Sequence, residues 1–201
     1  MERKQDPPYR ALVLYYGLGS PQQEFKLRQL LTRLGIRWKR VDPRELTQTV
    51  GSLAGLDTPA SGPAPDSVTP PAESMIVMHQ LSDDQINTLL GQIRQSGLRI
   101  DLKAVVTEHN RAWTFLDLAA ELRRENTFMQ RFMALRSLVK KGENLLDQNP
   151  DSPELTLALA EAKRQLAAAQ GPDEVDMRLF AAAGQKLAVL LQQLEPAGPG
   201  L

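Results

Sequence analysis

The sequence predicts an α/β protein, a four-stranded and mostly parallel sheet with helices on its faces, followed by a C-terminal α-helical extension. Three observations lead to this fold class. Four short apolar runs have the length of buried strands. Helix start signals follow each run, and this alternation is typical of parallel sheets. Beyond Glu125 the apolar residues recur only at helical spacing. The expected strand order is 2-1-3-4.

Composition excludes several classes of protein. The 201 residues carry 24 Lys and Arg against 24 Asp and Glu, which argues against a general nucleic-acid binder. The chain has no cysteine, so disulfides, zinc–thiolate sites and iron–sulfur clusters are excluded. No apolar run reaches the length of a membrane span. We therefore expect a cytoplasmic protein with no nucleic-acid partner, no membrane partner and no metal site, and no residue pattern identifies a cofactor.

The first strand is predicted over residues 11–16. A helix follows, in which Ser20 is the N-cap and Gln23 completes a capping box. Gly35 stands at the expected helix end, and residues 36–41 form the second predicted strand.

A second capping box, formed by Asp42 and Glu45, predicts a helix that continues to about Gly55. Residues 55–73 then hold five prolines and no Lys or Arg. Such a composition cannot bury enough apolar surface to order itself, so we expect an exposed, disordered excursion within the domain.

The third strand is predicted over residues 75–79, and Ser82 with Gln85 forms another capping box. The helix behind it ends at Gly97. Residues 100–107 form the fourth predicted strand, and Thr114 with Asp117 caps the helix that follows. The α/β domain is therefore expected over residues 9–125.

The two halves of this domain resemble each other. A shift of 62 residues superposes the following pairs: Ser20 on Ser82, Gln23 on Gln85, Leu27 on Leu89, Leu31 on Ile93, and Gly35 on Gly97. An ancient duplication would produce this pattern, and so would any two strand–helix units of equal length.

Residues 127–195 are predicted to form a helical hairpin or bundle, and residues 196–201 a disordered tail. Turns near residues 149–153 and 170–172 divide the extension into three amphipathic segments. Such segments can close on their own chain or present an apolar stripe to a second copy, and we expect this region to mediate any homo-oligomer.

The fourth strand and the turn behind it carry a family resemblance. The pattern is a strand ending in K-A-V-V-T followed by N-x-x-W, here Lys103, Ala104, Val105, Val106, Thr107, Asn110 and Trp113. Over about residues 10–125 the chain resembles a bacterial family of domains of unknown function, number 3783. The chain departs from the family pattern at Glu108 and His109, where a proline-containing turn is more usual. The resemblance implies a provisional link to amino-acid metabolism and no established activity.

In a parallel sheet, ligands bind beyond the carboxyl ends of the strands. That rule selects the residues that follow strands one, three and four, which we expect to meet along a single rim as a ligand-binding site. These residues are Tyr16, Gly17, Gly19, Ser20, His79, Gln80, Thr107, His109, Asn110 and Trp113. Polar residues also collect at such places simply because strands leave the core there.

Other patterns allow two interpretations each. Gly17 to Gln22 resembles a phosphate-binding turn but lacks the third glycine, so Gly17 and Gly19 also fit as simple turn formers. Glu108 and His109, with His79, could form an acid–base or metal group, although neighbours on a strand end point apart. Lys103 is consistent with a lysine at the sheet edge that reaches solvent, or with an anchor for an anionic ligand. The basic clusters near residues 33–44 and 123–141 are consistent with solvent-exposed helix faces, or with an RNA-binding surface.

The leading functional hypothesis is a non-catalytic module that binds a small ligand or a protein partner and assembles through its C-terminal helices. One alternative is an enzyme of small-metabolite or amino-acid metabolism that uses His79, His109 and Glu108 in proton transfer. Another is a pure assembly or adaptor protein.

Overall fold

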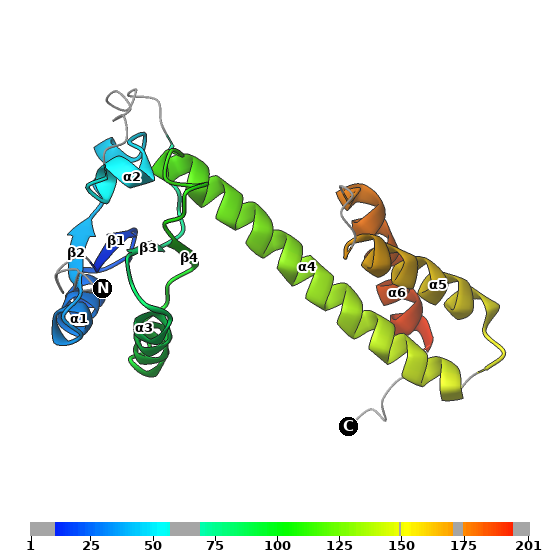
Figure 1. Ribbon diagram of the computed structural model, residues 1–201. Helices are drawn as coiled ribbons and strands as arrows, with labels where there is room; N and C mark the ends of the chain where they lie inside the picture. The colour runs from blue at the N-terminus through cyan, green and yellow to red at the C-terminus, as the bar shows by residue number, and fades with distance from the viewer. Residues whose placement is uncertain (1–10, 57–68, 149, 171–174, 195–201) are drawn as a thin grey trace, which may run out of the picture. The chain divides into compact units, whose positions relative to one another are not determined.

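A computed structural model describes residues 11–56, 69–148, 150–170 and 175–194. The chain divides into two compact units, Met1–Arg124 and Glu125–Leu201. Helix α4 (Phe115–Gln148) begins in the first unit and continues into the second (Figure 1). Most of the predicted disordered excursion and the predicted tail lie outside the described residues.

The first unit contains one four-stranded sheet in the order β2-β1-β3-β4, which confirms the predicted strand order. Its strands are β1 (Leu12–Tyr16), β2 (Arg37–Arg40), β3 (Met75–His79) and β4 (Leu102–Val105). The pairs β1/β2 and β3/β4 are parallel, whereas the central pair β1/β3 is antiparallel. The sheet is thus mixed and mostly parallel.

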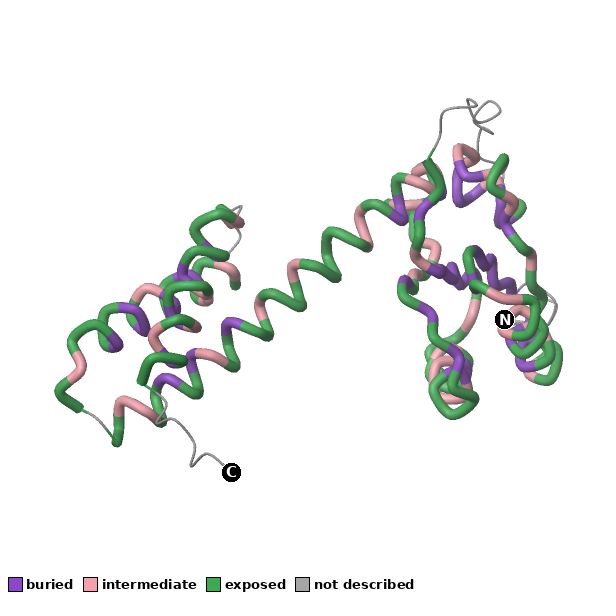
Figure 2. Tube along the Cα trace, turned by 180° about the vertical axis from the view of Figure 1, so that it is seen from behind, coloured by how far each residue is buried: buried purple, intermediate pink, exposed green. Residues whose placement is uncertain are grey.

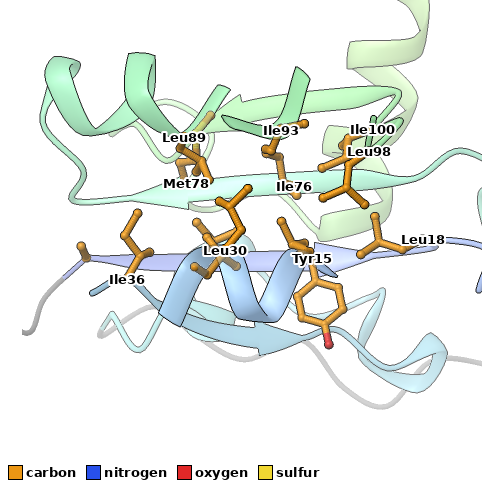
Figure 3. Packing of buried hydrophobic residues seen from close by; sticks show 14 residues of the cluster. Tyr15, Leu18, Leu30, Ile36, Ile76, Met78, Leu89, Ile93, Leu98 and Ile100 are labelled. Atoms are coloured by element: carbon orange, nitrogen blue, oxygen red, sulfur yellow. The ribbon is translucent and has the colours of Figure 1, made fainter. Parts of the chain in front are cut away.

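Helices cover both faces of the sheet. Helices α1 (Pro21–Arg33) and α3 (Asp83–Gln95) lie on one face, where Figure 3 shows side chains such as Leu30 and Leu89 meeting those of Tyr15 and Met78. The other face is covered by α2 (Val50–Leu53) and the first turns of α4, with a core that includes Leu14, Val77 and Phe115. Every residue of β1 and β3 is buried, as expected for strands covered on both faces (Figure 2).

The helix predicted from Asp42 to Gly55 is instead two short pieces. The capping box of Asp42 and Glu45 is present, but it opens a 3-10 helix, η1 (Pro43–Glu45). Thr49 then caps α2 separately. The chain between the two pieces pairs with the other half of the unit, and those tertiary hydrogen bonds replace the helical ones.

This pairing follows an approximate twofold relation. Thr49 and Thr114, the N-cap and its counterpart before α4, form an isolated antiparallel bridge. The flanking hydrogen bonds are reciprocal: Val50 N to Trp113 O and Phe115 N to Gln48 O, then Gly51 N to Arg111 O and Leu116 N to Leu46 O. Each bond is thus repeated by its counterpart 65 residues away along the chain. An antiparallel bridge produces such a reciprocal pair of bonds in any protein, so this pairing describes the symmetry of the unit and leaves duplication and a chance match of two strand–helix units both open.

The second unit is a helical bundle built from α4, α5 (Pro153–Ala168) and α6 (Met177–Leu194), in line with the predicted helical extension. Its core includes Leu135, Leu159 and Leu187. A Cβ at Gly142 would lie 2.8 Å from Leu159 Cδ2, so the glycine lets α4 approach α5 closely. None of the helices in the described residues combines the length and hydropathy of a membrane span.

Candidate functional site

The antiparallel central pair divides the predicted ligand site between two rims. Leu12 at the start of β1 pairs with His79 at the end of β3, so these strands end at opposite edges of the sheet. The first rim holds four of the candidates, Tyr16, Gly17, Gly19 and Ser20. The second rim holds the other six, His79, Gln80, Thr107, His109, Asn110 and Trp113. The expectation of a single rim is therefore wrong, because it required β1 and β3 to run in the same direction.

The first rim contains a cleft of about 440 Å³. The cleft lies between the turn that joins β1 to α1 and the end of β2, and Gly17, Ser20, Glu24 and Arg40 are among its lining residues. Gly17 and Gly19 adopt φ angles of 68° and 73°, so both act as turn formers. Sequence reasoning missed Arg40, although the carboxyl-end rule applied to the second strand would have selected it.

Charges around this cleft are paired. The Glu24 carboxylate forms ion pairs with Arg28 at 2.9 Å and with Arg40 at 3.3 Å. Arg28 also donates to the Tyr15 hydroxyl at 2.6 Å and lies over the Trp38 ring, 4.8 Å from its centroid. Burial raises the pKa of Tyr15, so this hydroxyl keeps its proton and remains a neutral partner near pH 7.

The second rim has a different character. His79 is buried, and burial lowers the pKa of its imidazole. Gln80 follows β3 as Gly17 follows β1, and its φ of 54° is the one positive value for a non-glycine residue in the described chain. A residue with positive φ therefore follows the strand in both halves, although the second half lacks the glycine that suits this conformation and its connection to the helix is one residue shorter.

Thr107 and Asn110 hold the turn after β4. Asn110 Oδ1 accepts from Thr107 N at 2.9 Å, and Thr107 Oγ1 accepts from Asn110 N at 3.2 Å. Asn110 Nδ2 also donates to the Val105 carbonyl at 3.0 Å. These contacts give both side chains a structural role.

Glu108 and His109 do not form an acid–base couple here. Glu108 pairs with Arg111 at 3.0 Å, while His109 lies edge-on against Trp113 with 5.0 Å between ring centroids. Among the residues that the structure describes, no group of three His, Asp or Glu is placed to hold a metal ion.

A larger, mostly apolar groove of about 580 Å³ lies in the second unit between α5 and α6. Leu157, Val189 and Leu190 contribute apolar side chains to it, and Glu154 and Lys186 contribute charges. The sequence pattern predicts an amphipathic helix here. It does not distinguish the residues of α6 that face the core, such as Leu187, from those that line this groove, such as Val189.

Comparison with protein families identifies one region. Residues 74–129 match a family model described as a domain of unknown function (DUF3783), which confirms the family that the Lys103–Trp113 pattern indicated. The match is shorter than the expected residues 10–125. It spans β3, α3, β4 and the start of α4, the second of the two halves related by the approximate twofold. No match was found among curated proteins or among solved structures.

Gly17→Ala should destabilise the first unit by about 2 kcal/mol, because a left-handed φ is costly for alanine and the new Cβ would lie 3.0 Å from the Glu73 carbonyl oxygen. Gly19→Ala is the matched control, with φ 73° and no atom within 4 Å, and should cost about 1 kcal/mol. Urea unfolding followed by tryptophan fluorescence measures both, since Trp38 and Trp113 lie in the first unit. Equal losses for the two variants would contradict the close approach to Glu73.

The first unit should lose stability as pH falls below about 6.5, the ordinary histidine pKa, because unfolded His79 then binds a proton that folded His79 resists. The loss should continue until pH reaches the lowered pKa of the folded state. His79→Gln should flatten this part of the stability profile, because glutamine binds no proton in this pH range. Parallel profiles for wild type and His79→Gln would show that burial does not disfavour the imidazolium.

Proposed function

We propose that this chain is a non-catalytic protein-binding module that assembles with a second copy of itself through α5 and α6. The observation that carries the proposal is the apolar groove between these helices. Leu157 is 67% exposed and Val189 is 47% exposed, both on its walls. Large apolar side chains that line a common groove are typical of interaction sites.

Helix α6 contributes apolar side chains on either side of Gln185 and Lys186 to such an interface. Ala182 and Val189 line the groove, and Leu179 lies one turn earlier on the same helix face. An 18-residue helix is about 27 Å long, enough to support an interface with roughly 800 Å² buried on each side.

The charges of the groove favour a second copy as the occupant. Glu154 comes from α5 and Lys186 from α6, so the groove carries one charge of each sign. A twofold-related copy would bring the same pair in reverse order, which lets Glu154 of each chain meet Lys186 of the other. The separation of His79, His109 and Glu108 into different local contacts supports the non-catalytic part of the proposal.

The wild-type chain should have the mass of a dimer in size-exclusion chromatography with light scattering. The double variant Leu157→Glu/Val189→Glu should have the mass of a monomer, because burying two carboxylates in the apolar groove is costly. Phe25→Glu is the matched control, since Phe25 is a 61% exposed apolar residue on α1, and it should remain dimeric. A monomeric wild-type chain, or a dimeric double variant, would refute the proposal.

Small-ligand binding at the first rim is a second candidate function, favoured by the cleft of about 440 Å³. Glu24 and Arg40 place opposite charges on its wall, and a small zwitterion such as an amino acid would exchange their 3.3 Å ion pair for one pair with its own ammonium group and one with its carboxylate. That chemistry agrees with the link to amino-acid metabolism that the family resemblance implies.

A free amino acid that binds this cleft should raise the melting temperature of the full chain, since it stabilises only the folded state. The shift should disappear in Arg40→Met and persist in Arg33→Met, a matched change outside the cleft lining. If none of the 20 common amino acids shifts the melting temperature at millimolar concentration, this candidate fails.

A further inference from the structure

We propose that the groove between α3 and the edge strand β4 binds an acidic peptide segment, which adds to the sheet as a fifth strand. This inference concerns a different surface from the α5/α6 groove and from the first-rim cleft. It rests on the charge, the backbone and the shape of this edge.

The groove measures about 420 Å³. Its floor is apolar and comes from Ile93, Leu98 and Ile100, all of which are buried. Its wall carries three cations, Arg94, Arg99 and Lys103. A basic wall above this floor suits a strand whose groove-facing side chains are acidic, while its apolar side chains lie on the opposite face.

These three cations outnumber the acidic groups of the groove, whose one carboxylate, Asp101, lies near enough to Lys103 and Arg99 for their charges to help lower its pKa. Within the described part of the chain, Arg94 and Arg99 form no ion pair, and Lys103 donates only to the Ile100 carbonyl oxygen. The one carboxylate of the groove, that of Asp101, accepts hydrogen bonds from the Ser74 backbone N–H at 2.9 Å and hydroxyl at 2.7 Å. The groove therefore keeps a net positive charge that favours an anionic occupant.

The related edge of the first half differs. There Lys39 pairs with Glu45 at 3.0 Å and Arg40 with Glu24 at 3.3 Å, so two of the cations of β2 have intramolecular carboxylate partners. Strand β2 starts two residues after Gly35, whereas β4 starts five residues after Gly97. The three additional residues, 99–101, supply Arg99 and Asp101, so the basic groove is particular to the second half.

The backbone of β4 is open on its outer side. Leu102 N and Val106 N donate to β3, to Ser74 O and Met78 O, each at 2.9 Å. Alternation along the strand then directs the backbone groups of Lys103 and Val105 away from β3. The Val105 carbonyl oxygen already accepts a hydrogen bond from Asn110 Nδ2. The N–H and C=O of Lys103 and the N–H of Val105 therefore remain to form hydrogen bonds with an added strand.

The outward-bonding residues of β4, Lys103 and Val105, also direct their side chains to the α3 side of the sheet. Lys103 is paired with Ile76, whose side chain belongs to the α1/α3 core, so Lys103 projects on the α3 side of the sheet. Val105 projects on the same side and is 38% exposed. Every second side chain of a strand added beside β4 would therefore lie along the groove.

The test uses the full chain and a fluorescein-labelled hexapeptide of alternating Glu and Val, with binding followed by fluorescence anisotropy. We expect saturable binding, and no binding of the matching Lys–Val peptide. Arg94→Glu and Arg99→Glu should each weaken binding about tenfold. Arg33→Glu, in the last turn of α1 as Arg94 is in the last turn of α3, should leave the affinity unchanged.

Strand addition is tested separately from charge. Val105→Pro removes an outward N–H and no bond to β3, so the variant should keep the wild-type unfolding profile and bind the peptide about tenfold more weakly. A peptide N-methylated at alternate residues tests the same bonds without altering the protein and should also bind about tenfold more weakly. The proposal is overturned if the Glu–Val peptide shows no saturable binding, if the arginine variants bind it normally, or if the methylated peptide binds as well as the unmodified one.

Discussion

The antiparallel pairing of β1 with β3 is the constraint on which the rest of the first unit depends. It joins two parallel strand pairs into one sheet and sets the ends of β1 and β3 on opposite edges. On the face covered by α2 and α4, the reciprocal hydrogen bonds around Thr49 and Thr114 repeat the same relation. Sheet and loops therefore follow one approximate twofold, and any site built on strand ends must occur in two related places.

The two places carry different chemistry on the same backbone. Tyr16 ends β1 where His79 ends β3, and both following residues, Gly17 and Gln80, have positive φ. Arg40 near the first rim is paired with Glu24, whereas Val105 stands at the corresponding end of β4. The halves thus share their hydrogen-bonding framework and differ in the side chains that a ligand or partner would meet.

Much of the fold could be predicted from local sequence. The capping pairs of Asp42, Ser82 and Thr114 depend on residues three positions apart, and each is present. The direction of β3 relative to β1 could not be predicted, because the long stretch of sequence that separates the second predicted strand from the third imposes no fixed crossover. The basic groove at β4 was missed for a similar reason. The predicted order already placed strand four at an edge, but recognising the groove also requires knowing that Arg94 and Arg99 lie beside Lys103 and form no ion pair with any described residue.

Covalent linkage of the halves has a consequence for how the unit is assembled. A chain with only one half would leave the backbone of its inner strand without hydrogen-bonding partners on one edge. A second chain would then have to complete the sheet, at a rate and yield set by protein concentration. In this chain the two inner strands belong to one polypeptide, so their effective concentration is high and independent of expression level. The two halves also have different amino-acid sequences, so the surface residues of one half can be substituted without altering the corresponding residues of the other half.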